Sequence, residues 1–188
     1  MTAHPVAAGK SSIGFVELER LFPLVLVDRP AVYLDLACGA GKYSLALAPR
    51  LAEGSLLHGL DLWEEGVTAL RSEAARLGFP HVSADVADLT KPLPVPDASV
   101  DVCLIATVLH DLIPAGREAV LGELQRVLAP EGAVVVIEFK PLDHGPGPRR
   151  EHRIAVADAE ALFAPHGFVR DALADMGEYT YLARFVRG

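Results

Sequence analysis

The chain has 188 residues, of which 51% are hydrophobic, and a formal net charge of -8 at pH 7. This length and apolar content suit one domain with a sizeable core. We expect a single domain over residues 1–188, with an N-terminal tail and helix at 1–30 as a candidate lid and a core at 31–188. The negative charge and the lack of a Lys/Arg block argue against a nucleic-acid partner, because binding phosphates needs a basic surface.

The sequence also carries no clear signal for membrane insertion, export or metal binding. No apolar stretch approaches the roughly 20 residues of a membrane-spanning helix, and the first residues lack the charged start and apolar centre of a secretory signal. The two cysteines, Cys38 and Cys103, form no CxxC pair, so the sequence predicts no metal site. Such cysteine usage is typical of reducing compartments, and we expect a cytoplasmic protein of undetermined oligomeric state.

Extended and helical segments alternate through the first half of the chain. A tail of small residues runs to Ser12. The segments that follow are a helix over 15–27, a strand over 32–37, a helix over 42–52, a strand over 55–61, an amphipathic helix over 63–78 and a strand over 81–86.

The second half continues the alternation and then breaks it. The segments are a turn-rich stretch at 91–99, a strand over 100–106, a helix over 116–128, a turn at 130–132, a strand over 133–139, an irregular segment at 140–153, a helix over 157–167 and strands over 168–175 and 178–186. Apolar strands that alternate with helices predict an α/β fold, a doubly wound sheet with helices on both faces. The last two strands favour a closing antiparallel hairpin, and an irregular segment as long as 140–153 is usually functional or disordered.

A cluster of small residues, ACGAG, interrupts the chain between the first strand and its helix. Gly39 and Gly41 lie there at the carboxyl end of the strand, where ligands bind in doubly wound sheets. The match to the dinucleotide fingerprint G-x-G-x-x-G is partial, because Ser44 takes the third glycine's place. Two interpretations stay open: an ordinary strand-to-helix turn, or a turn whose backbone a ligand approaches closely.

Three aspartates accompany the next strands. Asp61 ends the second strand 20 residues after Gly41 (61 − 41). This is the position from which a carboxylate hydrogen-bonds the hydroxyls of a ribose. Asp85 closes the third strand, where a carboxylate can accept a hydrogen bond from an adenine amino group. Asp35 lies inside the first strand, and a charge there needs a partner, such as the amine of an amino-acid ligand. A strand-end aspartate is also a common surface feature.

Several stretches together carry a resemblance to a known family. They are LDLACGAGKYS, HGLDL, SADVADL, VDVCLIATVLHDL and RVLAPEGAVVVIEF. These resemble the successive motifs of class I S-adenosylmethionine-dependent methyltransferases, and most closely those of the small UbiE-like, or type 11, branch. KSS near the N-terminus, HD after the fourth strand and EFK after the fifth also resemble that branch. The resemblance covers nearly the whole chain and implies a Rossmann-like, seven-stranded sheet, mostly parallel with an antiparallel last strand.

The resemblance implies S-adenosylmethionine as the cofactor. This molecule carries no phosphate, so the glycines would let backbone amides approach its methionine part, and Asp61 would hold its ribose. The residues expected to contact the cofactor are Asp35, Ala37, Gly39, Gly41, Tyr43, Asp61, Leu62, Asp85, Val86 and Ala106.

His110, after the fourth strand, is the candidate general base, with Asp111 beside it to tune or orient the imidazole. The alternative is that His110 only caps a loop or helix. The candidate substrate contacts are Ser11, Ser12, Glu138 and Lys140. An exposed tail explains the two serines more plainly, and a structural ion pair explains Glu138 and Lys140 nearly as well.

The basic residues of the irregular segment leave a further choice open: Arg149, Arg150, His152 and Arg153 either recognise an anionic substrate or are solvated.

We therefore expect an S-adenosylmethionine-dependent methyltransferase that acts on a small-molecule acceptor, whose identity the sequence does not give. A nicotinamide-dependent oxidoreductase is the first alternative, and Ser44 in place of the third glycine counts against it. The second is a non-catalytic S-adenosylmethionine-binding protein. The sequence after the fourth strand lacks [DNS]-PP-[YF], which argues against methylation of base amino groups.

Overall fold

The structure is a computed structural model that describes residues 8–188, so the first part of the predicted tail lies outside the described residues. The helices are α1 (Leu18–Val25), α2 (Lys42–Leu47), α3 (Glu64–Leu77), α4 (Pro114–Val127) and α5 (Val156–Phe163). The strands are β1 (Val32–Leu36), β2 (Leu56–Asp61), β3 (Val82–Val86), β4 (Val100–Ala106), β5 (Leu128–Phe139), β6 (Phe168–Asp175) and β7 (Thr180–Arg187).

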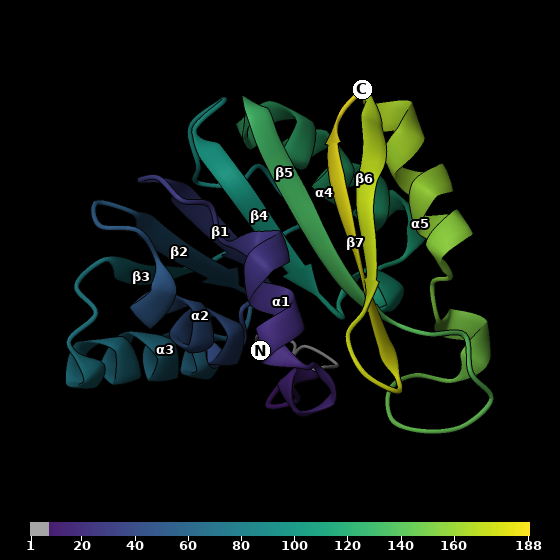
Figure 1. Cartoon of the computed structure of the whole chain (residues 1–188), viewed down its shortest axis with the longest axis horizontal. Helices are drawn as coiled ribbons and strands as arrows, with labels where there is room; N and C mark the ends of the chain where they lie inside the picture. The colour runs from purple at the N-terminus through teal and green to yellow at the C-terminus, as the bar shows by residue number, and fades with distance from the viewer. Residues whose placement is uncertain (1–7) are drawn as a thin grey trace.

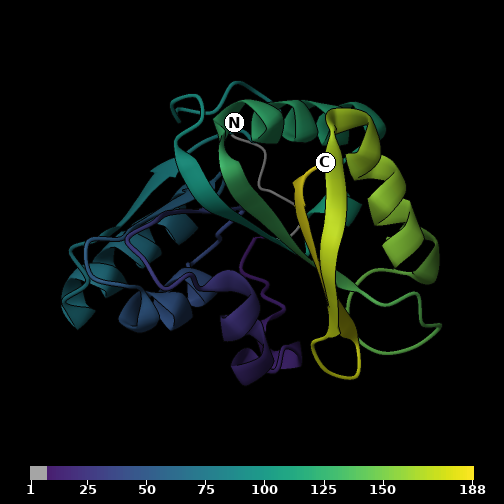
Figure 2. The same cartoon turned by 45° about the horizontal axis from the view of Figure 1, so that its top comes forward.

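The strands form one seven-stranded sheet in the order β3-β2-β1-β4-β5-β7-β6. Strands β1 to β5 pair in parallel, and β7 runs antiparallel to both β5 and β6. Figure 1 shows α1, α2 and α3 on one side of the sheet and α4 and α5 on the other, an arrangement that is also visible in the turned view of Figure 2. The predicted α/β class, the mostly parallel sheet and the closing hairpin are confirmed.

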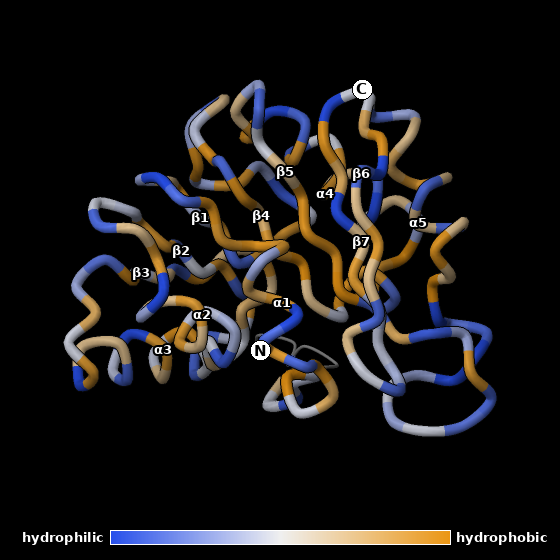
Figure 3. The backbone as a smooth tube through the Cα atoms, viewed as in Figure 1, coloured by the Kyte–Doolittle hydropathy of each residue, from blue (hydrophilic) through white to orange (hydrophobic). Residues whose placement is uncertain are grey.

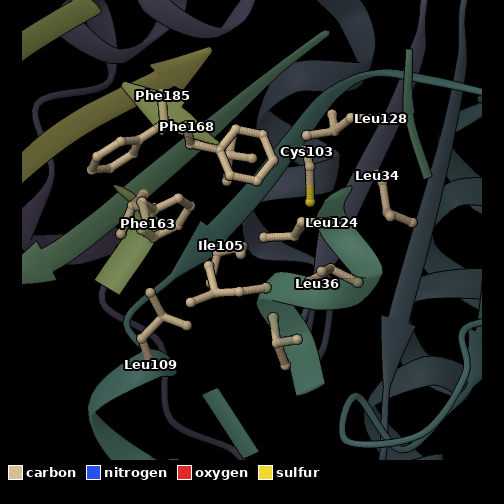
Figure 4. Packing of buried hydrophobic residues seen from close by; sticks show 14 of the residues in the cluster. Leu34, Leu36, Cys103, Ile105, Leu109, Leu124, Leu128, Phe163, Phe168 and Phe185 are labelled. Atoms are coloured by element: carbon tan, nitrogen blue, oxygen red, sulfur yellow. The ribbon is translucent and has the colours of Figure 1, made fainter. Parts of the chain in front are cut away.

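Two hydrophobic layers hold the helices against the sheet. One face buries apolar side chains from α1, α2 and α3, and the other buries those from α4 and α5. Figure 3 shows the hydropathy that produces this division, with apolar colours along the central strands and polar colours along the outer loops. On the α4–α5 side, Phe163 stacks on Phe185 with ring centroids 4.1 Å apart and meets Phe168 edge-on at 5.9 Å (Figure 4). Burying one such ring stabilises the fold by about 1.5–3 kcal/mol.

Some boundaries differ from those predicted, each for a local reason. The predicted helix at 15–27 shortens to α1, because residues before it make bonds outside the helix; the Glu17 amide, for example, donates to the Met176 carbonyl at 2.7 Å. Helix α2 ends at Leu47, and a 3-10 turn that contains Pro49 follows it. The turn predicted at 130–132 is a bulge within β5, since Val100 pairs with Leu128 and Val102 with Ala133.

The strand order reverses between β1 and β4, which lie side by side at the centre of the sheet. In doubly wound sheets the crevice at the carboxyl ends of the strands beside such a reversal is the usual ligand site. The ends of β1, β2 and β4 in this fold are therefore the place to look for function.

Candidate cofactor and active site

The turn after β1 uses its two glycines for different purposes. Gly41 has φ +73°, and a Cβ there would lie 2.2 Å from the Leu70 side chain of α3, so this glycine is required for packing. Gly39 has φ +54°, and a Cβ there would meet nothing within 4 Å. Ala37 also has a positive φ, 61°, which is uncommon for a residue with a side chain. Gly41 therefore fits the first interpretation, a tight turn, whereas Gly39 has open space beside its Cα, as the second interpretation requires.

Asp61 is joined directly to this turn. Its Oδ2 accepts the Gly39 amide at 2.8 Å and its Oδ1 accepts the Trp63 amide at 2.7 Å. The residue is 9% exposed. Because each carboxylate oxygen has a second lone pair, the side chain can still accept bonds from two ribose hydroxyls. The predicted neighbourhood of Gly39 and Asp61 is present in the structure.

Asp35 is buried behind the turn, 3% exposed, and its partner is Ser44, whose hydroxyl donates to Oδ2 at 2.6 Å. We expected the amine of a ligand in this role. Burial raises the pKa of Asp35 to about 7; the hydrogen bond from Ser44 opposes this rise and the charge of Asp61 adds to it. Ser44, treated in the sequence only as a missing glycine, is thus the residue that satisfies the buried acid.

We expect the Asp35→Asn variant to remove a pH dependence of stability. The folded-state pKa of Asp35 lies above the ordinary value of 3.8, so the folded protein binds the proton more tightly than the unfolded chain. Wild-type stability should therefore fall, relative to the variant, as the pH rises from about 4 to about 7, by at most about 1.4 kcal/mol per pH unit. Urea unfolding of both proteins between pH 4 and 8 measures the difference; parallel curves would contradict the assignment.

Two exposed apolar side chains flank Asp61 at the same edge. Leu62 is 49% exposed and Val86 46% exposed, and Val86 is the register partner of Asp61 across β2 and β3. Flat apolar surface of this kind suits the faces of an adenine ring.

The structure does not bring Asp85 together with these residues. Successive side chains of a strand point to opposite faces, so Asp85 lies on the other face from Val86. Its Oδ1 pairs with Arg71 at 2.5 Å and its Oδ2 lies 3.4 Å from His58. Because each carboxylate oxygen has a second lone pair, the contact with Arg71 leaves Asp85 able to accept a further bond, and its contact with the adenine stays a prediction.

The N-terminal segment lies across the ends of α2 and β4. Ser12 is 4% exposed, and its hydroxyl lies 2.8 Å from the Tyr43 hydroxyl and accepts from Thr107 Oγ1 at 2.9 Å. Thr107 follows Ala106 at the end of β4 and has φ +53°. The plainer expectation of an exposed tail is wrong at Ser12. Ser11 makes a local bond, accepting the Ile13 amide at 3.3 Å.

The same segment is tied to the C-terminal hairpin. Thr180 Oγ1 donates to the Phe15 carbonyl at 2.7 Å, and the Glu17 amide donates to Met176. Residues 11–17 thus connect the cofactor side of the edge to the β6–β7 turn, a placement that suits a cover over the site.

His110 forms a buried pair with Glu138. Its Nδ1 lies 2.7 Å from Glu138 Oε2, and its backbone amide donates to Oε1 at 3.3 Å. The side chain of His110 is 7% exposed and that of Glu138 is fully buried. Asp111, which we expected to orient the imidazole, lies 3.7 Å from Nε2, beyond hydrogen-bond distance. The orienting residue in the structure is Glu138.

This environment makes His110 a stronger base. Burial alone would lower its pKa, and Arg117 acts in the same direction, but the hydrogen bond and charge of Glu138, together with the charge of Asp111, raise the pKa above its ordinary 6.5. A carboxylate accepts the Nδ1 proton, so the neutral imidazole keeps its lone pair on Nε2.

Lys140 does not pair with Glu138. Its ammonium lies 3.0 Å from Asp175 Oδ1 and donates to the Gly177 carbonyl at 2.8 Å. The interpretation of Glu138 and Lys140 as one ion pair is therefore wrong, and Lys140 serves the β6–β7 turn in the structure.

Arg153 organises the irregular segment at 140–153. Its guanidinium donates to four main-chain carbonyls of that segment, those of Lys140, His144, Pro146 and Pro148, at 2.8–3.3 Å. The side chain lies over the Phe139 ring, 5.7 Å from its centroid, and the residue is 8% exposed. Arg150 pairs with Asp143 at 2.9 Å. These two cations hold the segment itself, which weakens the interpretation that they recognise an anionic substrate.

Aromatic rings surround the His110 side of the edge. Phe139 meets His110 at 5.9 Å between centroids and Phe15 at 6.4 Å, and Phe15 meets Tyr179 at 6.0 Å. These rings come from β5, the N-terminal segment and the β6–β7 turn.

Residues 8–188 offer neither a cluster of metal-binding side chains nor a membrane-spanning helix. No group of three or more His, Cys, Asp or Glu side chains in that range is placed to hold a metal ion. Nor does any helix there combine the length and apolar character needed to cross a membrane.

Known proteins share both the architecture and the motifs. A methyltransferase from Aquifex aeolicus, described as S-adenosylmethionine-dependent, superposes with a TM-score of 0.83 at 23% identity, covering 93% of this chain and 92% of that one. This likeness shows the fold, which is that of class I S-adenosylmethionine-dependent methyltransferases. The type 11 family model, described as "Methyltransferase domain", matches residues 34–136. The chain therefore belongs to the type 11, UbiE-like branch of that class, whose cofactor is S-adenosylmethionine.

Two curated relatives match over part of their length. Demethylmenaquinone methyltransferase from Thermus thermophilus is 37% identical over 128 residues, which is 67% of this chain and 55% of that protein. The 2-phytyl-1,4-naphtoquinone methyltransferase from Trichormus variabilis is 28% identical over 154 residues, 80% of this chain and 62% of that protein. The chain thus spans less than two thirds of the length of either relative.

Proposed function

We propose that this chain transfers a methyl group from S-adenosylmethionine to a small, uncharged aromatic acceptor of the quinol class. The observation that carries the proposal is the His110–Glu138 pair, buried beside aromatic rings at the carboxyl edge of the sheet. The names of the two relatives, both of which specify quinones, support the choice of acceptor.

The residues at the edge fit the cofactor. The open space beside the Gly39 Cα suits the methionine part, the free lone pairs of Asp61 suit the ribose, and Leu62 and Val86 suit the adenine. The cofactor would supply a methyl group that its own sulfonium activates, so the protein has mainly to align the acceptor with it.

The acceptor side favours an uncharged ring. Phe15, which is 38% exposed, packs against Tyr179 and against the buried Phe139, and aromatic pairs are stabilised by stacked or edge-on contacts. The cations of Lys140 and Arg153 are already committed to protein groups. An anionic acceptor would therefore find neither of these two cations free.

His110 would take a proton from the acceptor as the new bond forms. The proton of an acceptor hydroxyl passes to Nε2, and Glu138 holds the Nδ1 proton and stabilises the resulting imidazolium. The deprotonated ring then gives its electron pair to the methyl carbon, and the carbon–sulfur bond breaks with its pair going to sulfur. Loss of the ring proton to solvent, and return of a proton from the His110 imidazolium to the ring oxygen, complete a C-methylation, and the products are S-adenosylhomocysteine and the methylated quinol.

We expect S-adenosylhomocysteine, and not NADH, to protect the protein from thermal unfolding. A ligand at about 100 times its dissociation constant raises the stability by about 2.7 kcal/mol. Comparable protection by NADH would contradict the proposal.

Transfer of labelled methyl from S-adenosylmethionine to 2-phytyl-1,4-naphthoquinol, compared with the anionic 1,4-dihydroxy-2-naphthoate, then tests the acceptor. Binding without turnover on either would favour the second alternative, a non-catalytic cofactor-binding protein.

A further inference from the structure

Trp63 stands at a position where a tryptophan side chain cannot cap the helix that follows. It is the N-cap of α3, a place that favours Ser, Thr, Asp or Asn because their side-chain oxygen accepts a free amide of the first turn. Trp63 makes no side-chain capping bond. Its backbone amide instead donates to Asp61 Oδ1, which fixes the residue directly beside the carboxylate proposed to hold the ribose.

The indole lies between the glycine turn and the N-terminal segment. A Cβ on Gly66 would stand 2.3 Å from Trp63 Cε3 and 2.8 Å from the Gly39 carbonyl, so the ring packs next to the turn. A Cβ on Gly9 would come within 3.9 Å of Trp63 Cη2, so the N-terminal segment reaches the ring as well. Glycine at 66 is what allows this large side chain to approach Gly39.

The indole nitrogen has no hydrogen-bond partner. Trp63 Nε1 is buried, and it is the one buried side-chain nitrogen or oxygen in residues 8–188 that lacks a partner. Leaving a buried donor unsatisfied costs about 1–3 kcal/mol, and buried tryptophan N–H groups usually find an acceptor. A donor left over at this position points to a ligand rather than to the fold.

We propose that Trp63 is a further cofactor-binding residue: its indole forms a wall of the cofactor site, and its N–H donates to an oxygen of the bound cofactor. The inference rests on the proposed function, since it needs the cofactor at this edge. Two kinds of acceptor oxygen are present on such a ligand, those of the ribose and those of the carboxylate of the amino-acid part. Adenosine carries only the first, so it separates the two.

The wild-type protein gives the first test. Trp63 is the single tryptophan of the chain, so the intrinsic fluorescence reports on this side chain alone. We expect S-adenosylhomocysteine to change the emission saturably, with the same dissociation constant that calorimetry gives. Calorimetric binding with an unchanged emission spectrum would overturn the inference.

The Trp63→Phe variant gives the second test, because it keeps a ring and removes the donor. A lost bond to a neutral ribose oxygen should weaken S-adenosylhomocysteine and adenosine alike, by about 2- to 12-fold. A lost bond to the carboxylate should weaken S-adenosylhomocysteine by about 12-fold or more and leave adenosine unchanged. Tyr33→Phe is the matched control, since that hydroxyl accepts the Val27 amide away from the turn. Equal affinities in wild type and a folded variant would overturn the inference, whereas a wild type that binds no S-adenosylhomocysteine would overturn the proposed function instead.

Discussion

Replacing His110 with alanine should lower turnover on the quinol by about 10²- to 10⁴-fold while cofactor affinity is retained. In the proposed function the imidazole accepts the acceptor's proton, and its hydrogen-bond partner is Glu138 and not a residue of the glycine turn, so the cofactor contacts should be kept. Steady-state kinetics with 2-phytyl-1,4-naphthoquinol and calorimetry with S-adenosylhomocysteine measure the two quantities. A raised Michaelis constant with the maximal rate kept would show that His110 only shapes the acceptor pocket. No change in either constant would show that the histidine is structural.

The pH profile identifies the base independently of the alanine variant. A general base must be unprotonated, so the wild-type rate should fall as the pH drops through the pKa of His110, which the pair with Glu138 holds above 6.5. In the Glu138→Gln variant the imidazole loses the carboxylate that raises its pKa. The acidic limb of the pH–rate profile should therefore move to lower pH, and the maximal rate should fall. Asp111→Asn is the matched control, because Asp111 lies 3.7 Å from Nε2 and should move the limb less. Superimposable profiles for wild type and Glu138→Gln would contradict the role of the pair.

The fold was predictable because its signals are local and repeated. Each parallel strand is a short apolar run, and α3 carries its own stop at Gly78, which has φ +74°. The boundaries that were missed depend on distant partners. Nothing local in residues 15–17 reports that the Phe15 carbonyl and the Glu17 amide bond to the C-terminal hairpin.

The site was predictable where chain position alone determines placement. Gly39 lies in the turn after β1 and Asp61 ends the neighbouring parallel strand β2, so the topology brings them together and the structure joins them by a hydrogen bond. The directions of the side chains, by contrast, could be established only from the structure. The registers place Asp85 on the face opposite Val86, and Glu138 rather than Asp111 reaches the His110 ring because β5 lies next to β4.

Replacing Asp61 should weaken the cofactor by about tenfold to a hundredfold or more. Hydrogen bonds to a charged group each contribute about 1.5–3 kcal/mol, and the ribose hydroxyls would lose a carboxylate in both the Ala and the Asn variants. Calorimetry with S-adenosylhomocysteine measures the loss. Asp85→Asn is the matched comparison, since it neutralises a carboxylate at the end of the next strand that pairs with Arg71. An unchanged affinity in a folded Asp61→Asn variant would show that the ribose lies elsewhere.

The same substitutions should also affect stability, a cost that the sequence does not reveal. Asp61 satisfies the amides of Gly39 and Trp63, so Asp61→Ala leaves two donors without their acceptor and should destabilise the fold by about 1–3 kcal/mol. Asp61→Asn retains one acceptor oxygen but turns an N–H toward the other amide, and should fall between wild type and Ala. Urea unfolding without ligand measures this loss of stability separately from the loss of binding. If Asp61→Ala unfolds at the wild-type midpoint while its affinity for S-adenosylhomocysteine is lost, the carboxylate serves the ligand alone. If the stability and the affinity both fall, the same carboxylate stabilises the turn and binds the cofactor.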